Sequence, residues 1–167
     1  MHRHIAIATT ILVTFTGAAG AQRCRICAPE DTIVRTHFAP AFGLHFGSPQ
    51  KASAALGFVR GESWQRNGAE HSRLFAFYAE PGLSGGRASV AFIDYGHGNF
   101  GSGVGIAATA LRTWKDPWSA NENMTYAGAE ILLWPIVFIG PRIGIFHSIS
   151  GTTSKPWLMS FDFGIGL

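Results

Sequence analysis

Near its end the chain carries residues of the types that hydrolytic enzymes use: His147, Ser148, Ser150 and Asp162. A serine nucleophile must lie within hydrogen-bond reach of the base that activates it. In an extended strand, residues two apart share a face, but Ser150 follows His147 by three residues and falls on the opposite face. We therefore keep His147, Ser150 and Asp162 only as the catalytic candidates of an alternative interpretation, and we favour a protein without catalytic activity.

Three charged residues, Glu130, Arg142 and Asp162, belong to segments that are otherwise apolar or small. If these segments are strands of a small barrel, the three side chains can point into its interior. A charge that is buried alone is costly, so interior charges must pair with one another. We predict that Glu130, Arg142 and Asp162 form an interior polar network, in preference to a substrate site.

The two cysteines of the chain are Cys24 and Cys27. In an oxidising compartment they would pair as a small structural disulfide, with redox or metal-binding roles as the alternatives. A redox role needs the pair at the start of a helix in a βαβ unit, and no such pattern follows. His37 and His45 lie eight residues apart, too far along a strand to chelate one ion. We expect no metal and no cofactor.

The start of the chain is typical of a secretory signal peptide, with a short basic beginning, an uncharged apolar run over 5–15 and small residues over 19–21. The apolar run is shorter than the ~20 residues of a membrane-spanning helix. We predict a signal peptide over 1–21, an N-terminal segment with the cysteine pair over 22–31, and one domain over 32–167. The formal net charge is only +3 and the basic residues are scattered, so we expect no nucleic-acid partner.

Both ends of the predicted domain alternate between large apolar residues and other residues. In the last segment one face carries Trp157, Met159, Phe161, Phe163, Ile165 and Leu167, and near the start one face carries Phe38, Pro40, Phe42, Leu44 and Phe46. Alternation with a period of two predicts strands with one apolar face. Because Pro40 cannot donate to a ladder, we expect a bulge or an unpaired position there.

Six further strands are predicted between these ends, at about 51–60, 72–80, 86–95, 102–113, 124–134 and 136–149, the last taken together with its turn. The separators are rich in turn-forming residues, among them Gly140-Pro141. Short strands at this spacing favour a sandwich or barrel over a βαβ fold. We predict an all-β fold, an antiparallel up-and-down β-barrel of about eight strands.

Alternation alone does not say which face points inward, but three features favour a membrane barrel over a soluble one. The faces opposite the large apolar residues are small, as at Ala39, Ala41 and Gly43, which suits the narrow interior of an eight-stranded barrel. Charged residues make up 14% of the chain, against a usual quarter. Four tryptophans fall near predicted strand ends, where membrane barrels carry aromatic girdles: Trp64, Trp114, Trp118 and Trp157.

With its signal peptide, its strand count and its closing apolar segment Trp157 to Leu167, the chain over 32–167 resembles the small eight-stranded outer-membrane β-barrel proteins of Gram-negative bacteria. It departs from them at Leu167, where that family usually ends in Phe or Trp, and in loops that do not alternate cleanly between long and short. The resemblance implies transmembrane β-strands, an outer-membrane location, contact with membrane lipid, and recognition of the last strand by the outer-membrane assembly machinery.

We therefore predict an exported outer-membrane β-barrel with a structural or envelope-associated role. One alternative is a soluble periplasmic or secreted barrel that binds a small apolar ligand through Phe38, Phe42, Phe161 and Phe163. A second alternative is a membrane-embedded lipid hydrolase. The region around His147 resembles a lipid A deacylase of the small-barrel group, which places a His, a Ser and a later acid near its end. That enzyme has a His-x-Ser pattern, where this chain has Ile149, and a Glu, where this chain has Asp162.

Overall fold

The computed structural model describes residues 35–66, 69–97, 101–136, 138–150 and 156–166 of the 167-residue chain. The predicted signal peptide, the Cys24 and Cys27 pair and the terminal Leu167 lie outside the described residues.

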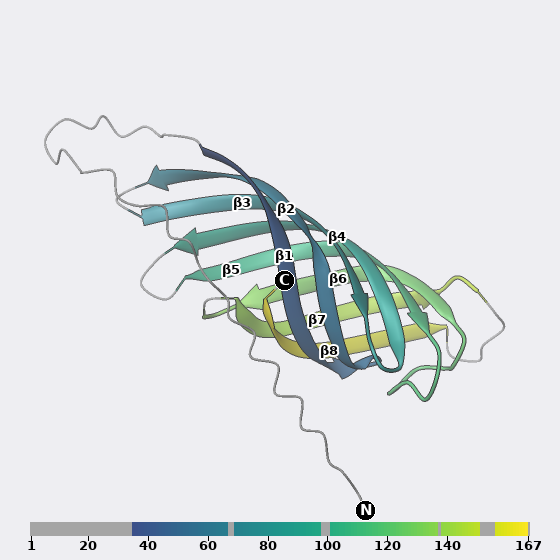
Figure 1. The fold of residues 1–167 in the computed structure, drawn as a ribbon. Helices are drawn as coiled ribbons and strands as arrows, with labels where there is room; N and C mark the ends of the chain where they lie inside the picture. Colours follow the sequence, from purple (N-terminus) through teal and green to yellow (C-terminus); the bar gives the residue numbers. More distant parts are fainter. Residues whose placement is uncertain (1–34, 67–68, 98–100, 137, 151–155, 167) are drawn as a thin grey trace, which may run out of the picture.

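The described residues form eight strands and no helix (Figure 1). The strands are β1 (Arg35–Ser48), β2 (Lys51–Arg66), β3 (Ala69–Pro81), β4 (Gly85–His97), β5 (Ser102–Thr113), β6 (Thr125–Trp134), β7 (Ile139–Ser148) and β8 (Trp157–Gly166). Each strand pairs antiparallel with the next, and β8 pairs with β1, so that one sheet closes into a ring. The predicted all-β, up-and-down fold of about eight antiparallel strands is confirmed.

Most of the large apolar side chains point away from the ring. The side chains that point into it are small, polar or members of two interior apolar clusters. In β8 the residues Trp157, Met159, Phe161, Phe163 and Ile165 are exposed, whereas Leu158, Ser160, Asp162 and Gly164 are buried. The same alternation runs through β5 and β6. Successive side chains of a strand point to opposite faces of the sheet, so the alternation of the sequence becomes an apolar outside and a mixed inside.

The interior holds two apolar clusters with polar residues between them. One cluster, which includes Tyr78, Tyr95 and Trp134, lies towards the end of the barrel where β1 begins. The other includes Tyr126 and Phe146 and lies towards the end where β5 leads into β6. Along β6 the buried order is Tyr126, Glu130, Leu132, Trp134, which places a charged residue between the two clusters.

The ring closes through a short ladder between β1 and β8, which joins Gly43–Ser48 to Phe161–Gly166. The first half of β1 extends beyond this ladder and is paired with β2. Pro40 lies in that half, opposite Phe58, and the register with β2 runs past it without a bulge. Of the two outcomes expected for Pro40, the structure shows no bulge and supports an unpaired position, since Pro40 lies outside the ladder between β1 and β8.

The turn predicted at Gly140-Pro141 is wrong, because both residues lie inside β7 and pair with Gly164 and Phe163 of β8. The chain turns earlier, between the end of β6 at Trp134 and the start of β7 at Ile139, where the Ile139 amide donates to the Ile136 carbonyl at 2.7 Å. Proline is tolerated in this strand because the ladder between β6 and β7 ends at Arg142, so Pro141 lies just beyond it.

The close approach of β8 to β1 requires a glycine at position 164. A Cβ atom added there would lie 2.1 Å from Cδ2 of the His45 ring and 2.4 Å from the Leu44 carbonyl oxygen. We expect Gly164→Ala to lower the free energy of unfolding by about 1–3 kcal/mol through overpacking, measured by urea denaturation of the purified barrel. The matched control is Gly96→Ala, where the nearest atom to an added Cβ is 3.8 Å away. Equal midpoints for the two variants would contradict the prediction.

Candidate functional site

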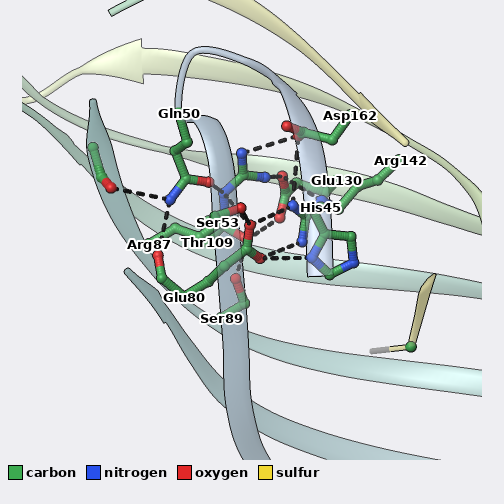
Figure 2. Close-up of polar contacts among 12 residues, drawn as sticks. His45, Gln50, Ser53, Glu80, Arg87, Ser89, Thr109, Glu130, Arg142 and Asp162 are labelled. Atoms are coloured by element: carbon green, nitrogen blue, oxygen red, sulfur yellow. Dashed lines mark hydrogen bonds and ion pairs between the residues drawn. The ribbon is translucent and has the colours of Figure 1, made fainter. Parts of the chain in front are cut away.

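The most prominent concentration of polar side chains is inside the barrel, and we refer to it as the polar core (Figure 2). It contains buried residues contributed by all eight strands and by the turn between β1 and β2. Its members are His45, Gln50, Ser53, Glu80, Arg87, Ser89, Thr109, Glu130, Arg142 and Asp162. Because every strand contributes at least one side chain, the polar core connects the whole ring from within.

Arg87 of β4 is fully buried and reaches the acids of three other strands. Its guanidinium donates to the Glu130 carboxylate, to Asp162 Oδ2 at 2.9 Å and to the side-chain oxygen of Gln50. It also lies 3.8 Å from Glu80 Oε1. A guanidinium carries its donors in a rigid fork, so one arginine can hold β6, β8 and the first turn in a fixed relation.

Arg142 of β7 makes the second set of ion pairs. It donates from two nitrogens to the two carboxylate oxygens of Glu80, at 2.7 and 2.8 Å. It also lies 3.7 Å from Glu130 and 3.5 Å from Asp162. The bidentate pair with Glu80 is the strong, directional form of an arginine–carboxylate contact. It connects β7 to β3, on the other side of the ring.

Neutral side chains donate further hydrogen bonds to the two glutamates. Ser53 donates to Glu80 at 2.6 Å, and Thr109 donates to Glu130 at 2.7 Å. Gln50 donates to the Glu80 main-chain carbonyl at 2.8 Å. Buried charges are tolerated only when they are paired and hydrogen-bonded, and these contacts meet that condition for Glu80 and Glu130.

The structure brings together Glu130, Arg142 and Asp162, the three residues assigned to an interior network from the sequence. The sequence interpretation missed Glu80 and Arg87, which carry most of the contacts. In the sequence, Glu80 stands before Pro81 and Gly82, and Arg87 follows Gly85 and Gly86, which are residue types that predict turns. Each therefore looked like an ordinary charge beside a turn, although both fall on the inward-facing positions of their strands.

The catalytic candidates are not brought together. His147 is exposed on the outer face of β7, where its ring meets Trp157 edge-on at 4.8 Å. Asp162 is buried inside the ring, and Ser150 accepts a hydrogen bond from the Thr125 amide. His147 pairs in register with Trp157, five residues along β8 from Asp162, or roughly 17 Å. This geometry offers no base–nucleophile–acid arrangement.

The two histidines considered as metal ligands are also apart. His37 shares a hydrogen bond with Ser63, while His45 lies in the polar core, 3.6 Å from Glu80. Among the described residues no group of three or more His, Cys, Asp or Glu has an arrangement that could hold a metal ion.

The outer surface carries a continuous set of exposed apolar residues, which we call the apolar belt. Its large members are Phe38, Phe42, Leu44, Phe46, Leu56, Phe58, Phe75, Phe77, Val90, Phe92, Val104, Ile106, Ile131, Leu133, Ile143, Ile145, Met159, Phe161, Phe163 and Ile165. Phe38 is 72% exposed and Phe161 is 56% exposed. The four phenylalanines expected to line a ligand cavity in a soluble barrel, Phe38, Phe42, Phe161 and Phe163, all point outward.

Polar residues mark the two limits of the apolar belt. On the outer face of β5 the belt lies between Ser102 and Arg112. Arg112 donates to Thr125 at one limit, and Arg73 pairs with Asp94 at the other. Ten residue steps separate Ser102 from Arg112. At about 3.4 Å a step and a tilt of about 40°, they span about 26 Å along the barrel axis.

The connection between β5 and β6 folds back over the turns beside it. The Trp118 amide donates to the Pro49 carbonyl at 3.1 Å, and the Trp114 indole donates to the Leu83 carbonyl at 3.1 Å. Lys51 of β2 donates to the Asp116 carboxylate. These contacts hold three connections together at one end of the barrel.

The pair of Lys51 and Asp116 makes the folding of this connection sensitive to acid. The hydrogen bond from Lys51, followed by its charge, holds the pKa of the Asp116 carboxyl below its usual range. The contact is therefore present above the unfolded-state pKa of Asp116 and is lost as the pH falls through its lower folded-state pKa. We expect Asp116→Asn to lower the hydrogen-exchange protection of the Trp118 amide about two- to fivefold at neutral pH, because an exposed pair is weak.

In the same experiment, wild-type protection at Trp118 should fall towards the level of the variant as the pH is lowered. Asp94→Asn removes a carboxylate at the other end of the barrel and serves as the control. If Asp94→Asn changes Trp118 protection as much as Asp116→Asn does, the local contact is not the cause.

No candidate for a membrane-spanning helix is found among the residues that the structure describes. Comparisons of the chain with protein-family models, curated proteins and solved structures found no match.

Proposed function

We propose that this protein is an outer-membrane β-barrel, held in lipid by its apolar belt, with a structural or envelope-associated role. The observation that carries the proposal is the direction of the side chains. Large apolar residues point outward on all eight strands, while the ion pairs of the polar core are enclosed. Lipid-embedded barrels have this arrangement, and barrels in water have the reverse.

The dimensions of the apolar belt support a lipid environment. Its height of about 26 Å along β5 is close to the apolar band of about 25 Å in outer-membrane barrels. A monomeric soluble protein rarely exposes an apolar patch above a few hundred Å², and the apolar belt surrounds the molecule. In water this surface would drive aggregation, whereas in a membrane the acyl chains of the lipids contact it.

The interior supports a structural role in preference to solute passage. Fully buried Tyr78, Tyr126 and Phe146 belong to the two apolar clusters, and the polar core lies between these clusters. Interior side chains of small barrels fill the lumen, which is the expected outcome for eight strands.

The lengths of the connections give an orientation. The connections over 67–68, 98–101 and 135–138 share one end of the barrel, and all of them are short. The other end has two short connections, over 49–50 and 82–84, and the two longest, over 114–124 and 149–156. Outer-membrane barrels place short turns on the periplasmic side and longer loops outside. In this proposal the end where β1 begins therefore faces the periplasm, and β8 is the strand presented to the assembly machinery.

The test is to fractionate cells that express the full-length chain and to run the outer-membrane fraction on a gel with and without boiling. We expect the protein in that fraction, with a mobility that changes on boiling because the closed ring resists detergent until it is heated. Recovery of the protein in the periplasmic fraction, with the same mobility before and after boiling, would overturn the proposal.

A further inference from the structure

A groove of about 340 Å³ lies on the outer surface of β1 to β4, towards the end of the barrel where β1 begins. The side chains that matter in its lining are Arg60, Glu62, Arg73, Phe75 and Phe92. The register places them in two adjacent rows across the strands. One row runs Phe38, Arg60, Phe75, Phe92, and the next, further from the apolar belt, runs Thr36, Glu62, Arg73, Asp94.

The chemistry of the groove changes in steps along β2. The exposed residues Phe58, Arg60 and Glu62 follow one another at every second position, about 6.8 Å apart. Phe58 belongs to the apolar belt and stacks on Phe38, with ring centroids 5.6 Å apart. From the apolar belt towards the end of the barrel where β1 begins, the surface therefore presents first a phenyl ring, then a guanidinium, then a carboxylate.

Arg60 is the unusual member of this series, because it lies between Phe38 and Phe75 in its row. The neighbouring Arg73 is ion-paired with Asp94 at 3.2 Å and packs over the Trp64 ring. Within the part of the chain that the structure describes, neither Arg60 nor Glu62 has a hydrogen bond or an ion pair. A guanidinium at the limit of the apolar belt can reach the phosphates of lipid headgroups, and a phosphate fits its donors well.

We propose that this groove binds a zwitterionic glycerophospholipid of the ethanolamine type. This inference rests on the membrane location proposed above. The acyl chains lie against Phe58, Phe75 and Phe92, and the phosphate diester accepts hydrogen bonds from Arg60. The ammonium group extends further towards the end of the barrel and donates to the Glu62 carboxylate. The order of groups along the lipid, apolar then anionic then cationic, matches the order along β2.

The carboxylate is what selects this headgroup. A choline headgroup carries a quaternary nitrogen without N–H groups, so it cannot donate a hydrogen bond to Glu62. A headgroup with a phosphate but no cation would leave Glu62 unpaired beside the phosphate charge. Because exposed charge pairs are weak, we expect a preference of about threefold for the ethanolamine lipid over the choline lipid.

The test uses the full chain purified from membranes and reconstituted into phosphatidylcholine bilayers that contain a small fraction of lipid spin-labelled on an acyl chain. Electron paramagnetic resonance measures how much of the labelled ethanolamine or choline lipid is held at the protein surface. We expect Glu62→Gln to abolish the preference and to leave the choline lipid unchanged. We expect Arg60→Gln to lower the association of both lipids about two- to fivefold.

Arg112→Gln is the matched control, because it removes an exposed arginine from the outer face at the opposite limit of the apolar belt. It should leave the preference intact. Equal association of the two lipids with the wild-type protein, or the same loss in Arg112→Gln as in Glu62→Gln, would overturn the proposal. So would removal of the preference by millimolar inorganic phosphate, which would make the groove a phosphate site.

Failure of the membrane proposal has a different signature. In that case the chain would not enter the bilayers and its gel mobility would not depend on heating, and the lipid site would fall with it. A chain that inserts and is heat-modifiable but shows no lipid preference overturns only the lipid site.

Discussion

Replacing Arg87 with leucine is expected to lower the free energy of unfolding by about 3–5 kcal/mol, the cost of breaking a buried ion pair from one side. Arg87 donates to Glu130, Asp162 and Gln50, and its side chain is completely buried. Without it, three carboxylates, those of Glu80, Glu130 and Asp162, lose a charged partner. Arg142 is then the one buried arginine left in the described strands. The measurement is urea denaturation of the barrel in lipid vesicles, followed by tryptophan fluorescence.

The control for this experiment is Arg112→Leu. Arg112 is exposed on the outer face and donates a hydrogen bond to Thr125, so its replacement should cost less than about 1 kcal/mol. Arg87→Lys keeps the charge but loses the fork, and we expect an intermediate loss. If Arg87→Leu unfolds at the same urea concentration as Arg112→Leu, the polar core contributes little to stability.

Replacing a whole buried ionic group by apolar residues is often neutral, so the polar core needs a reason beyond stability. The reason that the geometry suggests is specificity of strand position. Arg87 connects β4 to β6 and β8, and Arg142 connects β7 to β3. A one-residue slip of any of these strands would turn its charged residue to the outer face. The ion pairs therefore favour one register of the closed ring.

The sequence predicted the strands best where one face is uniformly large and the other uniformly small, as in β1 and β8. The sequence of β4 shows no such contrast, because apolar residues occupy both faces over 88–95. The structure explains this, because the inward-facing Ala91, Ile93 and Tyr95 belong to an interior apolar cluster while Val90 and Phe92 belong to the apolar belt. A strand that is apolar on both sides has no alternation to detect.

The pairing of charges across the interior could not be predicted from alternation. Around the wall, Arg87 is opposite Leu111, and Leu111 is opposite Tyr126. Nevertheless Arg87 contacts Glu130, four residues further along β6, across the inside of the ring. The tilt and stagger of the strands decide which interior side chains meet, and these are properties of the closed barrel as a whole. Alternation says only that a residue faces inward.

The direction of the apolar faces leads to the second large prediction, which separates a lipid from a water environment. Ala108 lies near the middle of the apolar belt on the outer face of β5, with Val104 and Ile106 on one side and Arg112 on the other. We expect Ala108→Arg to lower the free energy of unfolding in lipid vesicles by about 2–4 kcal/mol, because a charge at the bilayer midplane is costly.

The matched control is Ser102→Arg, which introduces the same side chain on the same face of the same strand but at the limit of the apolar belt. There the cost should fall to about 0–1 kcal/mol, because the arginine can reach the headgroups. In water both positions are exposed surface, where a substitution changes stability by only about 0.5 kcal/mol in either direction. For a barrel in lipid we therefore expect a large loss of unfolding free energy in Ala108→Arg and a small one in Ser102→Arg. Equal, small effects at both positions would mean that the apolar belt is covered by something other than a membrane, such as a second copy of the chain.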